Sequence, residues 1–312
     1  MTGKADLSLE VQRDDRVVRI VSPHWTVVHD CGAGGAIVEM RVHHGTNRNL
    51  LRAPLQAAVD GWQEGRETSP RASVSQGAET AELVFSGRLA DAGGAPGPVG
   101  YVHHYQYTPY AARHTLTLTF LDRLLIRRMG ALTLATDGAL TAYSYGSADY
   151  DKVKPRYLHV IGPHYDDLWA SLPSESGLVQ EDTRRPWQVT LMAEGVEGLQ
   201  WCGDSREYDW NRVCGVEGAG RFRLIREPDG AALELNPIDL PSGVSVSGTL
   251  RFGWYVILPN APELGRRKYY EVVIGTSPFP EDAQLEAWAG HGVDLLRIHQ
   301  DEKSYLEFER IE

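Results

Sequence analysis

Cysteine is scarce in this chain: the 312 residues include only Cys31, Cys202 and Cys214. Three cysteines are an odd number and follow no metal-binding spacing, so they predict neither a disulfide framework nor a structural zinc site. We expect them to be buried as small apolar side chains.

Long apolar runs are missing as well. No stretch approaches the roughly 18 apolar residues of a membrane-spanning helix, and residues 1–7 lack the apolar segment of a secretory signal. We therefore expect no membrane partner, and a cytoplasmic location by default.

Basic residues are fewer than acidic residues in this chain. The chain has 31 Lys and Arg against 42 Asp and Glu, a formal net charge of −11. Without a basic stripe to neutralise phosphates, nucleic acid is excluded as an expected partner. The balance fits a neutral or weakly charged small-molecule ligand.

The common catalytic and cofactor motifs are absent. We find no Gly-x-Ser-x-Gly elbow, no P-loop and no His-Glu-x-x-His. The glycine run Gly32–Gly35 precedes a predicted strand rather than a helix, so it predicts a tight turn and not a phosphate site. We expect no cofactor and no metal.

Period-two alternation of polar and apolar residues dominates what is present. It is typical of half-buried strands in antiparallel sheets. Turn signals rich in Gly and Pro separate these segments. Convincing helical periodicity appears only at Glu281–Gly290. The pattern predicts an all-β chain folded as a large antiparallel β-sandwich, with strands at Ala36–Val42, Glu82–Phe85, Arg113–Phe120, Trp187–Met192 and Val244–Phe252.

The last residues predict a change of architecture. A Pro-rich joint, Thr276–Pro280, precedes the helical segment, and a strand-like Gly292–His299 follows it. A helix that leads into an apolar strand is typical of the start of a parallel α/β unit. We therefore predict a sandwich domain over residues 1–280 and a short α/β-like tail over residues 281–312.

Aromatic residues beside polar hydrogen-bonding residues suggest a carbohydrate ligand. A sugar presents flat C–H faces and a fringe of hydroxyls, so its site needs aromatic rings with carboxylates, His or Arg around them. Core packing is the alternative role for such rings in a sandwich. The candidate carbohydrate-binding residues are Tyr105, Trp169, Trp201, Asp204, Arg206 and Trp210.

A histidine beside a carboxylate is the candidate for acid–base chemistry, because its pKa lies near neutrality. The candidate catalytic residues are His104, His164 and Asp166. Within a strand, the neighbours His103 and His104 are expected to point to opposite faces.

Two stretches carry a family resemblance. Residues 30–51, a glycine turn followed by a strand and Asn49-Leu-Leu51, resemble the opening hairpin of galactose-mutarotase-like supersandwich domains. Residues 198–210, 233–241 and 248–255 resemble, in that order, the N-terminal β-sandwich of uncharacterised bacterial glycoside-hydrolase-like proteins. In those proteins a (β/α)8 barrel follows the sandwich, and residues 287–299 are similar to its first strand.

The resemblance implies a carbohydrate-active context with catalytic carboxylates on the barrel, beyond this sequence. The sequence departs from the family pattern at Tyr255–Pro262, where an expected lysine is absent. A role that depends on that lysine is therefore not implied here.

Three hypotheses follow. The first is a sugar-binding accessory sandwich of a glycoside-hydrolase-type protein. The second is a self-sufficient supersandwich enzyme, a glycosidase, lyase or epimerase, that uses His and carboxylate residues on the concave sheet. The third is a structural subunit whose aromatics are all core or interface. The sequence indicates neither the sugar nor the oligomeric state.

Overall fold

The alternation at residues 113–120 lies in an unusually long strand, β10 (Ala111–Asp137), of 27 residues. Its first half pairs with β9, from Ala112 to Phe120, and its second half pairs with β17, from Leu132 to Asp137. Register shifts against β18 between Phe120 and Arg128 mark the bend between the halves. The strand thus leaves one sheet layer and enters another.

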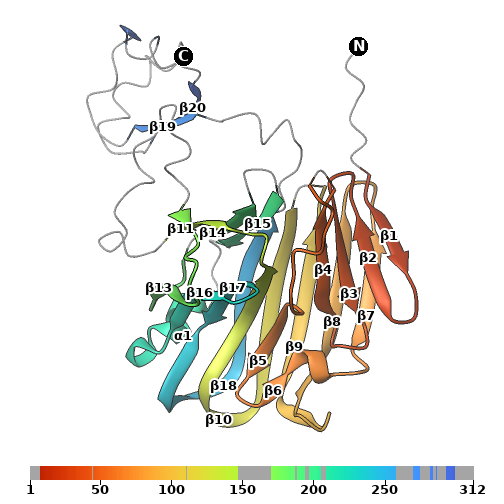
Figure 1. The fold of residues 1–312 in the computed structure, drawn as a ribbon. Helices are drawn as coiled ribbons and strands as arrows, with labels where there is room; N and C mark the ends of the chain where they lie inside the picture. Colours follow the sequence, from red (N-terminus) through yellow and green to blue (C-terminus); the bar gives the residue numbers. More distant parts are fainter. Residues whose placement is uncertain are drawn as a thin grey trace.

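The first layer carries the outer polar face described below. Its neighbouring strands are antiparallel throughout, and β18 is a second long strand that curves with β10 at the lower end of Figure 1. The strand order is β7 (Arg71–Gln76), β8 (Ala81–Ala90), β9 (Pro96–Tyr107), β10, β18 (Ile238–Ile257), β15 (Glu197–Gly203), β14 (Gln188–Ala193), β11 (Ala142–Gly146) and β12 (Ala170–Ser171).

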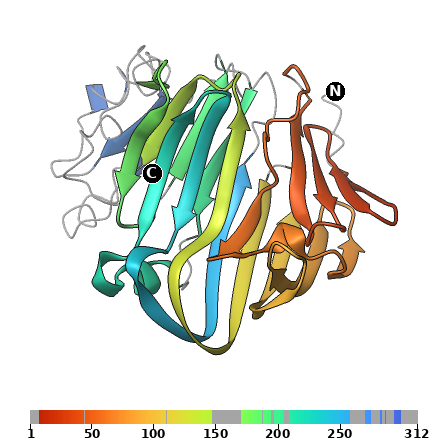
Figure 2. The ribbon, with the colours of Figure 1, turned by 60° about the horizontal axis from the view of Figure 1, so that its bottom comes forward.

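The second layer faces the first across the core (Figures 1 and 2). An isolated bridge between Ile37 and Leu55 joins its four N-terminal strands to β5. The order is β1 (Glu10–Arg13), β2 (Val17–Val21), β3 (Trp25–Asp30), β4 (Ala36–Val42), β5 (Gln56–Val59), β10, β17 (Gly230–Asn236), β16 (Arg221–Glu227) and β13 (Gly177–Asp182).

Short elements close the ends of the sandwich. Strand β6 (Trp62–Gln63) pairs with both β5 and β8, and so connects the two layers. The 3₁₀ helix η1 (Glu64–Arg66) follows it, while α1 (Trp210–Cys214) and η3 (Val216–Gly218) lie between β15 and β16 in the chain. Helix α1 is too short to show a helical periodicity in the sequence.

The structure, a computed structural model, describes most of the sandwich and part of the C-terminal region. The described residues are 8–43, 45–109, 111–146, 170–186, 188–193, 197–204, 209–257, 270–274, 282, 283, 286 and 293–298. Within these ranges, no helix has the length and apolar character needed to cross a membrane.

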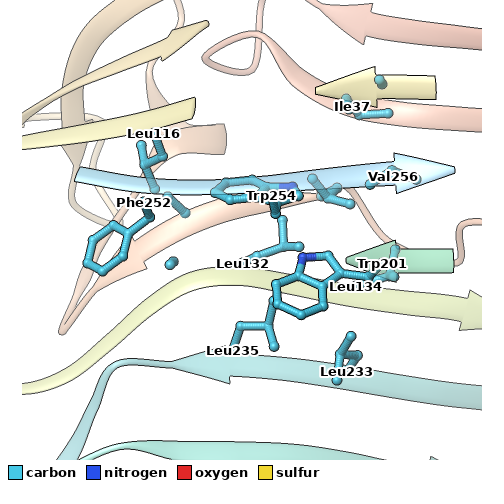
Figure 3. Packing of buried hydrophobic residues seen from close by; sticks show 14 of the residues in the cluster. Ile37, Leu116, Leu132, Leu134, Trp201, Leu233, Leu235, Phe252, Trp254 and Val256 are labelled. Atoms are coloured by element: carbon cyan, nitrogen blue, oxygen red, sulfur yellow. The ribbon is translucent and has the colours of Figure 1, made fainter. Parts of the chain in front are cut away.

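The core fills the space between the layers. Alternate residues of the first layer point into it, including Leu116 of β10 and Trp254 of β18. Figure 3 shows Trp201 and Trp254 among Leu132, Leu134, Leu233 and Leu235 of the second layer. The structure confirms the predicted all-β class and the large antiparallel sandwich.

The C-terminal region has a different pairing. Strands β19 (Tyr270–Ile274) and β20 (Val293–Ile298) form a parallel two-stranded sheet, and Asp282, Ala283 and Glu286 between them are helical. The predicted α/β-like tail over residues 281–312 stays a prediction, because most of these residues lie outside the described ranges. Because β19 lies before residue 280, the pairing crosses the predicted domain boundary, which stays a prediction.

Candidate functional site

A row of side chains crosses the outer face of the first layer. The strand registers pair Glu82 with Gln106, Gln106 with Arg113, Arg113 with Tyr255, and Tyr255 with Cys202. Directly paired residues in a sheet project to the same face. We call these five residues the outer-face row.

Hydrogen bonds connect the row. Gln106 Nε2 donates to Glu82 Oε1 at 3.0 Å, and Arg113 Nη1 donates to Gln106 Oε1 at 3.0 Å. The guanidinium carbon of Arg113 lies 6.0 Å from the centre of the Tyr255 ring. An arginine over an aromatic ring is held by a cation–π attraction, so Arg113 is fixed between an amide and a phenol.

Asp204 joins the row from the end of β15. Arg113 Nε donates to Asp204 Oδ2 at 3.0 Å, and the Asp204 side chain is only 3% exposed. The backbone N–H of Asp204 donates to the Gly253 carbonyl, which fixes the carboxylate against β18. The half-buried Arg185 also interacts with Asp204: partial burial lowers the pKa of Arg185, while the charge of Asp204 opposes that shift.

His104 lies one row away, paired with Thr115 of β10. Its Nε2 is 3.7 Å from Glu82 Oε2, and its side chain is 35% exposed. A half-exposed imidazole beside a carboxylate is suited to exchanging protons with a bound molecule. The predicted residues His104 and Asp204 therefore lie on one face, with Arg113 between their strands.

Cys202 is the one potential nucleophile in the row. Burial raises the pKa of its thiol to about 11. Because the thiolate is the reactive form, the Cys202 side chain stays protonated and unreactive at neutral pH. The row is thus equipped for hydrogen bonding and ring stacking rather than for thiol chemistry.

Three predicted sugar-contacting rings point the other way. Tyr105 and Trp201 are 0% exposed and Trp210 is 2% exposed. The Trp210 ring contacts Trp201, Phe222, Phe252 and Trp254 at centroid distances of 4.8–6.2 Å. Core packing, the alternative role in the sequence analysis, is what the structure shows for these rings. They offer no surface to a sugar.

Strand alternation explains this division. Tyr105 and Trp201 occupy the inward positions of β9 and β15, whereas His104 and Cys202 occupy the outward ones. The expected opposite orientation of His103 and His104 is confirmed, because His103 is 1% exposed. The candidate catalytic residue, His104, is therefore the outward-facing histidine of the two.

His103 belongs to a second polar group, which lies in the core. Its Nε2 donates to Glu64 Oε2 at 2.9 Å, and Glu64 also accepts the Ala57 N–H at 2.9 Å. We define the inner cluster as a set of polar and aromatic residues that are each at most 1% exposed, namely His29, Glu64, His103, Tyr105, Tyr107, His114 and Trp254.

His29 fixes a hydrogen-bonded path between the layers. Its Nδ1 lies 2.8 Å from the Gly35 carbonyl, which can only accept, so Nδ1 carries the proton. Burial lowers the pKa of His29 to about 4. The neutral ring therefore accepts a hydrogen bond at Nε2 from the Tyr107 hydroxyl, at 2.6 Å.

The predicted glycine turn holds this path in place. Gly34 and Gly35 have φ angles of 70° and 85°, and a Cβ on them would collide with Glu64 and the Phe85 ring, respectively. The Gly34 carbonyl accepts the Tyr101 hydroxyl at 2.8 Å. The turn therefore supplies carbonyl acceptors to the core.

Four predicted site residues lie outside the described residues: His164, Asp166, Trp169 and Arg206. Their roles stay predictions. Within the described ranges, no group of three or more His, Cys, Asp or Glu side chains is arranged to hold a metal ion. The three cysteines are free.

Four residues of this face were not among the predicted site residues, namely Glu82, Gln106, Arg113 and Tyr255. The alternation of inward and outward side chains along each strand could have identified them. On β9, the aromatic residues Tyr101, Tyr105 and Tyr107 share odd positions and face inward, which assigns the even positions to the outside. On β10, Arg113 shares its side with Thr117 and Thr119 and is outward by the same rule.

No protein-family model matches this chain, and no curated protein matches it either. Solved structures do match it, at low sequence identity. The Slr1438 protein from Synechocystis sp. PCC 6803 is 10% identical, with a TM-score of 0.47, over 84% of this chain and 98% of that one.

Two further similar structures are a mutarotase-like protein and an epimerase. A galactose mutarotase-like protein from Lactobacillus casei ATCC 334 is 9% identical, with a TM-score of 0.45, over 80% of this chain and 100% of that one. The galactose 1-epimerase from Lactobacillus acidophilus NCFM is 10% identical, with a TM-score of 0.40, over 81% and 98%. The chain thus has a distant structural similarity to galactose mutarotase-like proteins.

Proposed function

We propose that this chain is a carbohydrate-recognition sandwich that binds a sugar on the outer face of its first layer. The observation that carries the proposal is the placement of Arg113 among the Tyr255 ring, the Gln106 amide and the Asp204 carboxylate. An aromatic ring suits the C–H face of a sugar, and the Arg113 and Gln106 side chains suit its hydroxyls, while the buried Asp204 carboxylate fixes Arg113 in place.

The charge arrangement favours a neutral ligand. Two basic side chains of this face have a carboxylate nearby: Arg113 bonds to Asp204, and His104 lies beside Glu82. An anionic ligand would have to approach these carboxylates, whereas hydroxyls both donate and accept. The ligand class is therefore a neutral sugar or polysaccharide.

An accessory role in a glycoside-hydrolase-type protein is part of the proposal. Strands β19 and β20 are parallel, with helical residues between them. A parallel strand–helix–strand unit is the repeating element of a (β/α) barrel. This supports the proposal that the C-terminal region resembles the start of a (β/α) barrel, with β19 included in the unit.

Replacement of Arg113 by alanine is expected to lower sugar affinity about tenfold, because hydrogen bonds to charged groups are worth more than 1 kcal/mol each. The measurement is titration calorimetry with the best ligand from a polysaccharide panel screened by thermal shift. Arg113→Lys keeps the charge but not the planar fork, so it should restore little of the binding.

A matched control lies on the same strand. Arg128 of β10 pairs with Glu234 at 3.0 Å on the outer face of the second layer. Arg128→Ala removes an arginine–carboxylate pair with the same 3.0 Å distance, though a more exposed one, and should leave the affinity unchanged. Equal losses for both variants, or no ligand anywhere in the panel, would contradict the proposed site.

A second candidate, an enzyme acting on sugars, rests on the His104–Glu82 contact at 3.7 Å. Such a pair can transfer protons during epimerisation, elimination or hydrolysis. The purified chain should then form reducing or unsaturated products from the panel, and His104→Ala should abolish them without changing the thermal stability. Sugar binding without product formation would rule out the enzyme candidate and retain the recognition role.

A further inference from the structure

The inner cluster contains more polar atoms than its own hydrogen bonds satisfy. Six buried atoms have no hydrogen-bond partner among the described residues: Glu64 Oε1, His103 Nδ1, Tyr105 OH, His114 Nδ1, His114 Nε2 and Trp254 Nε1. In folded proteins nearly all buried polar groups are paired with protein or with ordered water. This concentration therefore requires a partner that the side chains themselves do not supply.

The residues carrying these atoms form one compact group. Ring centroids are 4.7 Å apart for Tyr105 and His114, 5.2 Å for His103 and Tyr105, and 5.4 Å for His114 and Trp254. Glu64 is bonded to His103. The unpaired atoms therefore belong to neighbouring side chains.

The hydrogen-bonding types identify the chemistry of the partner. Trp254 Nε1 can only donate and Glu64 Oε1, on a carboxylate, accepts. Burial holds the pKa of His114 well below its ordinary value, so its neutral ring offers one donor and one acceptor. A hydroxyl oxygen matches this mixture because it both donates and accepts. An anion would meet the Glu64 carboxylate.

We infer that the inner cluster is an internal binding site for hydroxyl oxygens, occupied by ordered water molecules that bridge Tyr105, His114, Trp254 and the Glu64–His103 pair. Each of the six atoms is shielded from solvent. Water is the hydroxyl source small enough to be enclosed there, and buried waters typically make about three hydrogen bonds to such groups. The inference does not depend on sugar binding.

The test is Tyr105→Phe, which removes one hydroxyl and keeps the ring. If that hydroxyl bonds to water, the folding equilibrium constant should fall about fivefold, as for the loss of an ordinary hydrogen bond. If the hydroxyl has no partner, its removal relieves a buried polar atom, and the constant should rise. Urea denaturation without added polyol measures the difference; an unchanged or increased constant overturns the inference.

Tyr101→Phe is the matched control, because the Tyr101 hydroxyl has a known acceptor, the Gly34 carbonyl at 2.8 Å. The Tyr105 and Tyr101 variants should lose similar amounts. A loss at Tyr105 only when glycerol is present would assign the site to a polyol and overturn the assignment to water. A crystal structure of the unaltered chain should show water about 2.7–3.2 Å from Tyr105 OH and His114; empty density there also overturns it.

Discussion

Replacement of Glu64 by alanine is expected to lower the free energy of unfolding by about 1–3 kcal/mol for each of the two buried donors that it leaves without an acceptor. The Glu64 and His103 side chains are 0% and 1% exposed, so solvent screens their contact little. The variant leaves the His103 imidazole and the Ala57 N–H without their acceptor. Urea denaturation at neutral pH measures the effect.

A double-mutant cycle separates the pair from the cavity that alanine creates. Glu64→Leu with His103→Leu removes both partners of the contact, so that only the Ala57 N–H is left without its acceptor. The double variant should therefore lose much less than the sum of the single variants. Additive losses would show that the contact contributes nothing beyond packing.

Acidification from pH 7 to pH 4 is expected to destabilise the fold by about 3 kcal/mol through His29 alone. Burial lowers the folded-state pKa of His29 from 6.5 to about 4, so the unfolded chain binds its proton first. This stability is fully present above pH 6.5 and is lost as the pH falls towards 4. Each pKa unit corresponds to about 1.4 kcal/mol.

The His114 ring acts in the same direction. Its pKa is also lowered by burial, and next by its charge interactions with His103 and His29. Protonating either ring places a charge in the core beside other titratable rings. The free energy of unfolding should therefore rise steeply between pH 4 and pH 6.5.

His29→Asn isolates the contribution of His29. The asparagine amide can donate to the Gly35 carbonyl as His29 Nδ1 does, but it does not titrate. Urea denaturation across pH 4–7 should give a shallower slope for the variant than for the unaltered chain. Carboxylates contribute equally to both curves, so identical slopes would refute the role of His29.

Both results depend on the same physical feature, a polar group that links the two layers. His29 of β3 bonds to Tyr107 of β9, and Glu64 of η1 bonds to His103 of β9. Hydrogen bonds constrain distance and direction, which apolar contacts between flat sheets do not. The inner cluster therefore fixes how β9 lies against the N-terminal strands.

Several features followed from the sequence because they depend on local chemistry. The alternation at Arg113–Phe120 predicted a strand, since successive side chains of a strand point to opposite faces. The same period placed His103 and His104 on opposite faces. The glycines of residues 31–35 predicted a turn, because only glycine readily adopts positive φ.

Only the tertiary structure decided which polar residues meet. Arg113 and Asp204 are 91 positions apart, and His103 and Glu64 are 39 apart, so no local pattern links them. Their contacts arise because β10 bends between layers and places distant strands side by side.

Burial was also decided by tertiary packing. Trp201 and Trp210 resemble sugar-stacking residues in the sequence, yet both are buried. The Trp201 ring contacts Trp210, and the Trp210 ring contacts Phe252 and Trp254. A large aromatic ring is stabilised in either environment, whether it packs against a sugar or against another ring. The sequence by itself therefore determined the strands, the turn and the alternation of faces, whereas the choice of the inward face required the second layer to be in place.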